Sequence, residues 1–233
     1  MKRILISLFV LAMAVAAQSA EWVAGRHYVV IPTQRTMVPA GKVEVLEVFS
    51  YGCPACYSYQ ATMSRIKAGI PKNAQVAYLP ASWHAEENWP IYQRAYLTAQ
   101  ALGVADKAHD AMFEAVWRTD ELGVIDRSTG RPKRKLPTME DVARFYERAT
   151  GVKAADFVKA SKSFGVDLKA RQADKQIVDM KIPSTPTIVV AGKYRIDNTA
   201  VRNEEIVELI KFLVAKETGD VKPAAAAPAA KKP

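Results

Sequence analysis

The chain has 233 residues, of which 49% are hydrophobic, a formal net charge of +9 and only two cysteines. This length and apolar content are enough for the core of one large domain or two small ones. No repeat is visible at solenoid periods, which excludes a repeat protein, and two cysteines are too few for a scaffold held together by disulfides.

Residues 1–20 have the pattern of a secretory signal peptide. Two basic residues precede an apolar stretch at 4–17, and small residues follow at 16–20. The stretch is short for a membrane span, and an uncleaved anchor is the alternative. No cysteine lies near the cleavage region, so we expect no lipoprotein. We expect cleavage near Ala17 to Ala20 and a mature protein that works outside the cytoplasm, where disulfides persist.

Residues 21–86 are predicted to form the first part of a domain built on a sheet. The pattern predicts a short edge strand, a longer strand, a helix and a second long strand, at 27–31, 43–49, 54 to about 68, and 75–79. Because a helix crosses between the two longer strands, they should be parallel. Pro54 suits the first helical turn, where its missing N–H leaves no hydrogen bond unmade.

Residues 87–181 have helical periodicity and are predicted to form an inserted all-helical domain. Apolar stripes indicate helices at 91–102, 108–117, 138–150, 153–161 and 166–180. Thr138, with Asp141 three residues later, matches a variant of the capping box.

Strand character returns in residues 182–217, the second part of the sheet domain. A strand at 187–191, a turn at Gly192-Lys193 and a strand at 194–196 precede an amphipathic helix from 203 to about 216. Two parallel strands and a hairpin make a mixed central sheet flanked by helices. The predicted fold class is therefore α/β, a thioredoxin-like fold with an inserted all-helical domain.

Two further segments have no assigned role. Residues 218–233 consist mostly of Ala, Pro and Lys, which have nothing to bury, and are predicted to be a disordered tail. A loop at 118–137 contains a basic run, 127–135, in which Gly130 and Pro132 indicate an exposed position. A nucleic-acid contact is one interpretation of such a run, but no aromatic residue is interleaved with it, so we expect no nucleic-acid partner.

The two cysteines, Cys53 and Cys56, stand at the junction of the strand at 43–49 and the following helix. Cys53 should lie just before the helix and Cys56 in its first turn. The free N–H groups and the positive dipole end of the helix stabilise a thiolate at Cys53. We expect Cys53 to be the exposed sulfur that is attacked and Cys56 its buried partner. A stabilised thiolate leaves readily, which favours disulfide donation.

Two other interpretations of the pair compete with redox chemistry. Zinc binding needs two more ligands, and His27, His84 and His109 are scattered, with His27 and His109 expected at the surface or at a boundary. An inert disulfide between residues so close would close a very small loop and stabilise little. We expect no metal, and no cofactor other than the redox-active Cys53–Cys56 disulfide.

Three features together resemble the DsbA family of periplasmic thiol:disulfide oxidoreductases, over roughly residues 40–217. They are the segment 45–57, the helical insertion, and Thr185-Pro186-Thr187 before the returning strand. The resemblance implies attack on Cys53 by thiolates of exported proteins, a cis Pro186 beside the cysteines, and backbone hydrogen bonds from Thr185 to substrate. From the residues alone, an ordinary trans turn at Pro186 is favoured.

Glu47 is a candidate proton carrier. It shares one face of its strand with Val43, Val45 and Phe49, and that strand should be covered on both sides. A carboxyl group there would have a raised pKa and could accept the proton of Cys56. The family has an acidic residue at this place, six before the first cysteine. The alternative is a solvated Glu at a strand end.

Pro54 and Ala55 lie between the cysteines and are expected to tune them. Oxidases of the family usually carry His at the second of these positions, so the resemblance breaks at Ala55. An imidazole there helps to stabilise the thiolate, which Ala cannot do. We expect Cys53 to be less acidic, and the pair less oxidising, than in a relative that contains the histidine.

The leading hypothesis is an enzyme that donates its disulfide to exported, unfolded proteins with free thiols, through a mixed disulfide at Cys53. The resemblance also implies a periplasmic location and reoxidation by a quinone-linked membrane partner of the DsbB type. Alternatives are a periplasmic reductase or isomerase, and a peptide-binding, chaperone-like domain with an incidental disulfide. Isomerases of this kind are usually dimers with a separate dimerisation domain, for which no segment remains, so we expect a monomer.

Four residues after the second long strand are a further candidate for substrate binding. These residues are Trp83, His84, Trp89 and Tyr92. They border a peptide groove near the cysteines or, alternatively, belong to the core.

Overall fold

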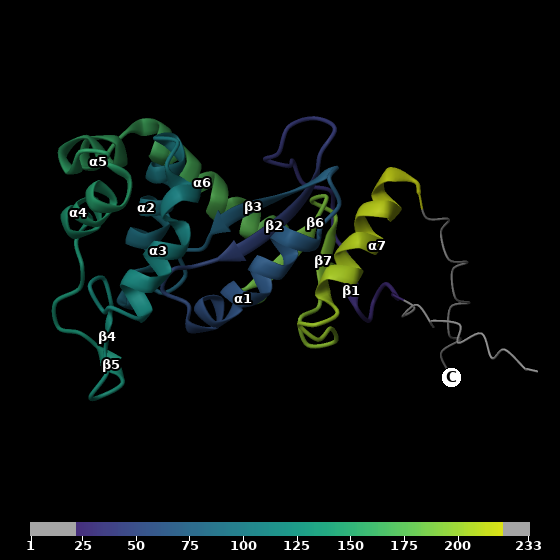
Figure 1. The fold of residues 1–233 in the computed structure, drawn as a ribbon, viewed down its shortest axis with the longest axis horizontal. Helices are drawn as coiled ribbons and strands as arrows, with labels where there is room; N and C mark the ends of the chain where they lie inside the picture. The colour runs from purple at the N-terminus through teal and green to yellow at the C-terminus, as the bar shows by residue number, and fades with distance from the viewer. Residues whose placement is uncertain (1–21, 221–233) are drawn as a thin grey trace, which may run out of the picture.

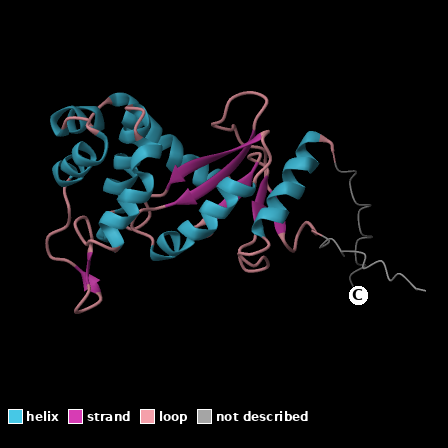
Figure 2. Ribbon diagram, viewed as in Figure 1, coloured by secondary structure: helices cyan, strands magenta, loops and turns pink. Residues whose placement is uncertain are grey.

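The computed structural model describes residues 22–220, which form a mixed sheet with helices on both faces and a helical part at one end (Figure 1, Figure 2). The predicted signal peptide, 1–20, and most of the predicted tail, 218–233, lie outside the described residues. In the described part of the chain, no helix is long and apolar enough to cross a membrane.

The sheet of the described domain has five strands in the order β1-β7-β6-β2-β3. Their bounds are Tyr28–Val30 (β1), Val43–Phe49 (β2), Ala74–Pro80 (β3), Thr187–Val190 (β6) and Tyr194–Ile196 (β7). β2 pairs parallel with β3 and antiparallel with β6, so the predicted parallel pair and the mixed sheet are confirmed. All seven residues of β2 are buried, because helices cover both faces of the sheet (Figure 1).

The helices lie close to their predicted positions. Their bounds are Pro54–Gly69 (α1), Trp89–Ala101 (α2), Ala105–Trp117 (α3), Met139–Thr150 (α4), Ala154–Ser161 (α5), Phe164–Asp179 (α6) and Ile206–Thr218 (α7), with a short 3-10 helix at Ala85–Glu87 (η1). Helices α2 to α6 come between β3 and β6 in the chain, as an insertion in the sheet domain. α1 and α7 lie on one face of the sheet and α6 on the other (Figure 1).

Local hydrogen bonds set the ends of three helices. The predicted capping box of α4 is confirmed, because the Thr138 side chain accepts from the Asp141 N–H and the Asp141 carboxylate accepts from the Thr138 N–H. α6 begins two residues earlier than predicted, because the Ser163 side chain caps it. α7 begins only at Ile206, because the preceding residues form a turn in which the Glu205 N–H donates to the Arg202 carbonyl.

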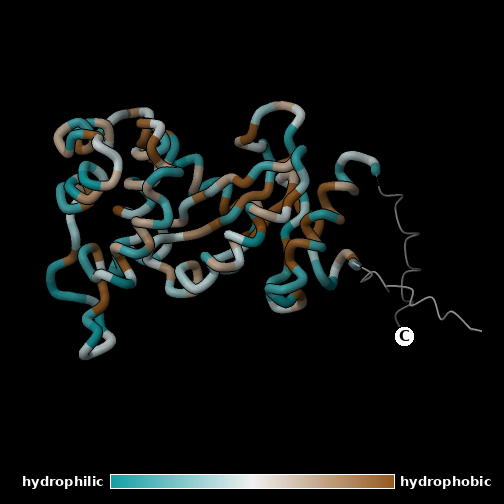
Figure 3. The backbone as a smooth tube through the Cα atoms, in the orientation of Figure 1, coloured by the Kyte–Doolittle hydropathy of each residue, from teal (hydrophilic) through white to brown (hydrophobic). Residues whose placement is uncertain are grey.

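A small hairpin inside the predicted basic loop was not predicted. It pairs β4 (Ile125–Asp126) with β5 (Arg131–Pro132) in antiparallel register. Gly130 takes a positive φ of 67° in the turn between them, a conformation that suits glycine. The hairpin projects from the helical part, at the end of the molecule opposite α7 (Figure 1). Most residues along the hairpin are hydrophilic (Figure 3).

An aromatic cluster joins the helical part to the end of β2. The Phe49 ring makes edge contacts with the rings of Tyr51, Tyr96 and His109, at centroid distances of 5.1, 5.3 and 5.0 Å. The expectation that His109 lies at the surface or a boundary is wrong, since it is only 2% exposed. Its place on α3, one turn before Phe113, puts it on the buried face of that helix.

Candidate active site

The two cysteines occupy the start of α1. Cys53 is the N-cap, Pro54 follows in the first turn, and the Cys56 N–H donates to the Cys53 sulfur at 3.2 Å. The Cys53 N–H donates to the Ser50 carbonyl at 3.1 Å, and this hydrogen bond closes the turn between β2 and α1. Both cysteines are free thiols in the structure, so it shows the reduced form of the pair. The helix start therefore aims its unpaired N–H groups at Cys53.

The exposures of the two sulfurs differ less than expected. Cys56 is completely buried, but Cys53 is itself only 5% exposed. The expectation of an exposed Cys53 is thus corrected to a nearly covered side chain. The cause is the segment that precedes β6, where the Thr185 carbonyl oxygen lies 3.5 Å from the Cys53 sulfur.

The environment separates the acidities of the two thiols. Hydrogen bonds from the Cys56 side chain, the Thr185 side chain and the backbone N–H groups of Cys56 and Ala55 outweigh desolvation and lower the pKa of Cys53 to about 6. Burial raises the pKa of Cys56 well above its usual value, and its hydrogen bond to Cys53 raises it further. In the reduced form at neutral pH, Cys53 is therefore mainly a thiolate and Cys56 a thiol.

The Thr185–Pro186 segment reaches the cysteines through the sheet. Thr187 begins β6 and pairs with Val48 near the end of β2, so the two preceding residues lie beside the turn that carries Cys53. The Thr185–Pro186 peptide bond is cis, as the resemblance implied. Asn198 donates a side-chain hydrogen bond to the Pro186 carbonyl and ties this segment to the loop after β7.

An open hollow of about 360 Å³ lies beside the cysteine motif. Residues of α1, of the cis segment and of the loop after β7 line it: Ala55, Ser58, Tyr59, Ser184, Thr185, Pro186, Asn198 and Asn203. Ala55 and Thr185 thus face the same space. Cys53 does not itself line the hollow, but its neighbours Ala55 and Thr185 do.

The aromatic residues after β3 do not line this hollow. Trp89 and Tyr92 are buried, whereas Trp83 is 41% exposed and His84 lies at the surface, each with its ring against Trp89. Trp89 also packs against the cysteine turn, because a Cβ atom added to Gly52 would lie 2.5 Å from its Nε1. Trp89 is therefore a buried residue that packs against the turn before Cys53.

Glu47 lies on β2 beneath the site and is completely buried. Neither of its carboxylate oxygens has a hydrogen-bond partner. Burial raises the pKa of Glu47 to about 8, although the nearby Lys67 charge acts in the opposite direction. The alternative of a solvated glutamate is therefore wrong. A carboxyl group that holds its proton at neutral pH can give it to a neighbouring sulfur. Once Glu47 is ionised, its negative charge raises the pKa of Cys56.

Two supporting residues on α3 were missed by the sequence-based interpretation. The Trp117 indole N–H donates to the Tyr51 carbonyl at 2.8 Å, and His109 Nδ1 lies 3.0 Å from the Tyr51 hydroxyl. Burial lowers the pKa of His109 to about 3, so this ring is neutral. Both contacts fix a residue that stands two positions before Cys53. The spacing of four residues between positions 109, 113 and 117 on one helix was the signal that could have placed these side chains on a common buried face.

Among residues 22–220, no group of three or more His, Cys, Asp or Glu side chains is placed to hold a metal ion. The expected absence of a metal and of any other cofactor stays a prediction.

Comparisons with known proteins support a relationship over the whole domain. No protein-family model matches the chain. The thiol:disulfide interchange protein DsbA of Pseudomonas aeruginosa is 32% identical over 225 residues, which cover 94% of this chain and 99% of that protein. The protein of the same name from Azotobacter vinelandii is 32% identical over 213 residues, with coverage of 91% and 92%.

A solved structure extends the likeness to three dimensions. The crystal structure of the oxidoreductase DsbA from Xylella fastidiosa matches with a TM-score of 0.71 at 30% identity, and the match covers 84% of this chain and 98% of that one. The likeness therefore includes the inserted helices as well as the cysteine motif.

Proposed function

This chain belongs to the DsbA family of thiol:disulfide oxidoreductases, and from that premise we propose that it oxidises the thiols of exported proteins in the periplasm. The observation that supports this best is the unequal acidity of its two cysteines. A pKa of about 6 for Cys53 stabilises the reduced enzyme as a thiolate. Stabilising the reduced form makes the disulfide a stronger oxidant.

The first step is attack by a substrate thiolate on the sulfur of Cys53 in the oxidised enzyme. A bond forms between the substrate sulfur and Cys53, and the Cys53–Cys56 bond breaks. Cys56 leaves with the electron pair, and because its pKa is held high by burial it takes up a proton. Glu47, fully buried and protonated at neutral pH, is the proton donor in this proposal.

The second step releases the product. A second substrate thiolate attacks the substrate sulfur of the mixed disulfide, and Cys53 leaves as a thiolate that the helix start and Thr185 stabilise. The substrate has lost two electrons and gained a disulfide, and the enzyme is reduced. In this scheme the hollow beside Thr185 and Pro186 holds the substrate chain, and Pro54 and Ala55 set the acidity of Cys53.

Continued turnover requires an oxidant for the reduced enzyme. We assign this role to a quinone-linked membrane protein of the DsbB type. The family membership supports it, as does the basic and then apolar pattern at 1–20, which is typical of export. Reduction or isomerisation is less favoured, because a thiolate as stable as that of Cys53 makes the enzyme a poor electron donor.

Trapping tests the proposal. In a Cys56→Ala variant the Cys53 thiolate can still attack a disulfide of an exported protein, which releases one of the two substrate sulfurs as a thiolate. Without Cys56 the resulting mixed disulfide cannot be resolved from the enzyme side, so exported proteins should accumulate as adducts that a reductant releases. The double variant Cys53→Ala/Cys56→Ala is the matched control and should form none. Absence of adducts in the single variant would overturn the mechanism. A Cys53–Cys56 pair that is mainly reduced in cells would overturn the oxidising direction instead.

A further inference from the structure

The β4–β5 hairpin carries a concentration of positive charge that disulfide exchange does not use. We call residues 125–135 the basic hairpin. Five of its side chains are basic and one, Asp126, is acidic, and the basic ones are Arg127, Arg131, Lys133, Arg134 and Lys135. The Asp126 carboxylate accepts from the backbone and side chain of Ser128 within the turn.

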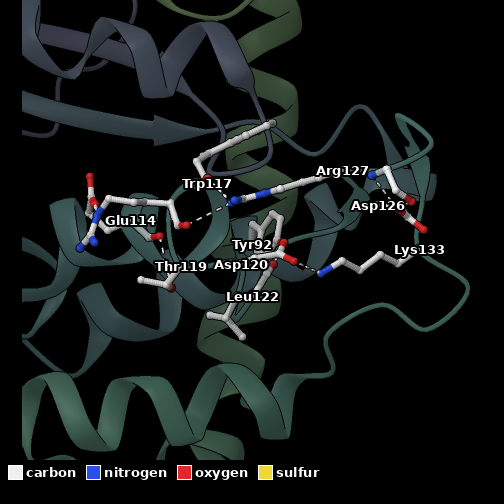
Figure 4. Close-up of polar contacts among 11 residues, drawn as sticks. Tyr92, Glu114, Trp117, Thr119, Asp120, Leu122, Asp126, Arg127 and Lys133 are labelled. Carbon is white, nitrogen blue, oxygen red and sulfur yellow. Dashed lines mark hydrogen bonds and ion pairs between the residues drawn. The ribbon is translucent and has the colours of Figure 1, made fainter.

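Two of these basic residues fix the hairpin to the end of α3. Arg127 donates to the carbonyl oxygens of Trp117 and Arg118, and Lys133 forms an ion pair with Asp120 at 2.8 Å (Figure 4). The Lys133 backbone N–H also donates to the Val124 carbonyl at 2.7 Å. The hairpin is therefore held at the residues that directly follow each of its two strands.

The other three basic residues point charge into solvent. Arg131, Arg134 and Lys135 are exposed, and none of them forms an ion pair with any residue between 22 and 220. Such a cluster of unpaired positive charges repels itself and attracts negatively charged groups.

The root of the hairpin is connected to the active site. Arg127 binds the Trp117 carbonyl, and the Trp117 indole donates to the Tyr51 carbonyl at 2.8 Å. Tyr51 stands two residues before Cys53. The root of the hairpin thus lies two hydrogen bonds away from the loop that carries the reactive sulfur, so these contacts fix the hairpin relative to the active-site turn.

We propose that the basic hairpin binds anionic lipid headgroups and so holds the active site close to a membrane surface. Residues 127–135, all exposed except the half-buried Lys133, contain no aromatic or large aliphatic side chain. A protein interface needs such anchors in its buried centre. Headgroups require charge alone, and each basic residue near an anionic surface strengthens binding by roughly fivefold. The idea that membrane proximity aids reoxidation rests on the proposed function. The predicted binding to lipid headgroups does not depend on it.

Vesicle binding tests this inference. The purified protein should cosediment at low salt with vesicles of phosphatidylglycerol and phosphatidylcholine, but not with phosphatidylcholine alone, and high salt should release it. Arg131→Gln/Arg134→Gln/Lys135→Gln should weaken binding at least tenfold. The matched control, Lys159→Gln/Lys162→Gln/Arg171→Gln, removes the same charge from exposed residues of the α5–α6 region that form no ion pair in the described chain and should weaken it less than twofold.

The outcomes separate this inference from the proposed function. Equal weakening by both triple variants would assign the binding to overall charge and overturn the role of the hairpin. Absence of vesicle binding by the parent protein would also overturn it. An acidic peptide serves as a second probe: a hairpin variant that still binds vesicles but no longer binds the peptide would assign the hairpin to a protein partner and overturn the inference. Oxidation of a soluble dithiol peptide without vesicles should be the same in all three proteins. Failure of that reaction in the parent would count against the proposed function alone.

Discussion

The behaviour of the sulfur at Cys53 depends on four hydrogen-bond donors that its neighbours supply. Two are backbone N–H groups of the first helical turn, and two are side chains, those of Cys56 and Thr185. The backbone donors come with any cysteine at a helix start, but the Thr185 contact exists only because β6 pairs with β2. The acidity of this cysteine is therefore partly a property of the sequence motif and partly a property of the sheet.

Replacing Ala55 by His should make Cys53 more acidic. The side chain would stand in the hollow beside the sulfur, where an imidazole adds a donor or a positive charge that Ala lacks. We expect the pKa of Cys53 to fall by about 1 unit and the redox equilibrium with glutathione to shift toward the reduced enzyme. Thiolate absorbance against pH measures the first change. Ala55→Gln controls for side-chain size, and an unchanged or less oxidising A55H protein would contradict the prediction.

Glu47→Gln should stabilise the protein and slow exchange. The folded-state pKa of Glu47, about 8, lies above its ordinary value of 4.5, so the unfolded chain ionises first and Glu47 destabilises the fold progressively from pH 4.5 to 8. The variant should therefore gain on the order of 3 kcal/mol at pH 7 and almost none at pH 4. Urea unfolding of the reduced protein at both pH values measures this.

The same variant should lose the proton donor of Cys56. We expect exchange to slow by roughly 100-fold or more, although stability rises. A gain in stability that is equal at pH 4 and pH 7 would show that the carboxyl group is not its source. Unchanged exchange would remove Glu47 from the mechanism.

Residue identity and spacing predicted the position of the cysteines at the helix start, the buried Glu47 and, through resemblance, the cis Pro186. They did not predict that Cys53 is nearly covered, because the covering residue is 132 positions away in the chain. His109 was missed for a related reason. A lone histidine on an apolar helical stripe has no local signal that distinguishes a boundary position from one inside an aromatic cluster.

At the scale of elements, the turn between β2 and α1 depends on close packing at Gly52. A Cβ atom there would meet Trp89 Nε1 at 2.5 Å and its Cδ1 at 2.6 Å. Gly52→Ala should therefore lower the free energy of unfolding by about 1–3 kcal/mol. The change should also disturb the position of Cys53, which follows directly.

A double-mutant cycle with Trp89→Phe identifies the cause. If the indole is the obstacle, Gly52→Ala should cost less in the Trp89→Phe background, with a favourable coupling of about 1 kcal/mol. Denaturant midpoints of the four proteins give this coupling. Purely additive effects would mean that Ala at 52 acts through the backbone of the turn instead.

Regular elements were predictable because apolar periodicity extends over several turns or alternations. The stripes of α2 to α6 and the apolar run of β2 are examples. The hairpin of β4 and β5 was not predictable, since strands of two residues have no alternation to detect. The full strand order was also not predictable. Only the β6–β7 pair is local, whereas β2 pairs with β6 and β1 pairs with β7 across more than 100 residues of chain.

At the scale of the whole molecule, the inserted helices belong to the active site as much as the sheet does. From α3, Trp117 and His109 contact Tyr51 in the turn before Cys53, and the loop after α3 carries the basic hairpin. The helical part therefore does more than cover the sheet. It fixes the active-site turn, and in our proposal it also orients that turn toward a membrane.

The acidity of Cys53 should appear in the stability of the whole protein. Its folded-state pKa of about 6 lies below its ordinary value of 9, so it stabilises the reduced fold fully above pH 9 and loses that effect as pH falls through 6. The disulfide form has no such group, whereas Glu47 is present in both. We therefore expect the stability difference, reduced minus oxidised, to fall by about 1 kcal/mol from pH 7 to pH 5. Urea unfolding of both forms measures it, and a difference that does not change with pH would mean that Cys53 is not the stabilised thiolate on which the oxidising activity depends.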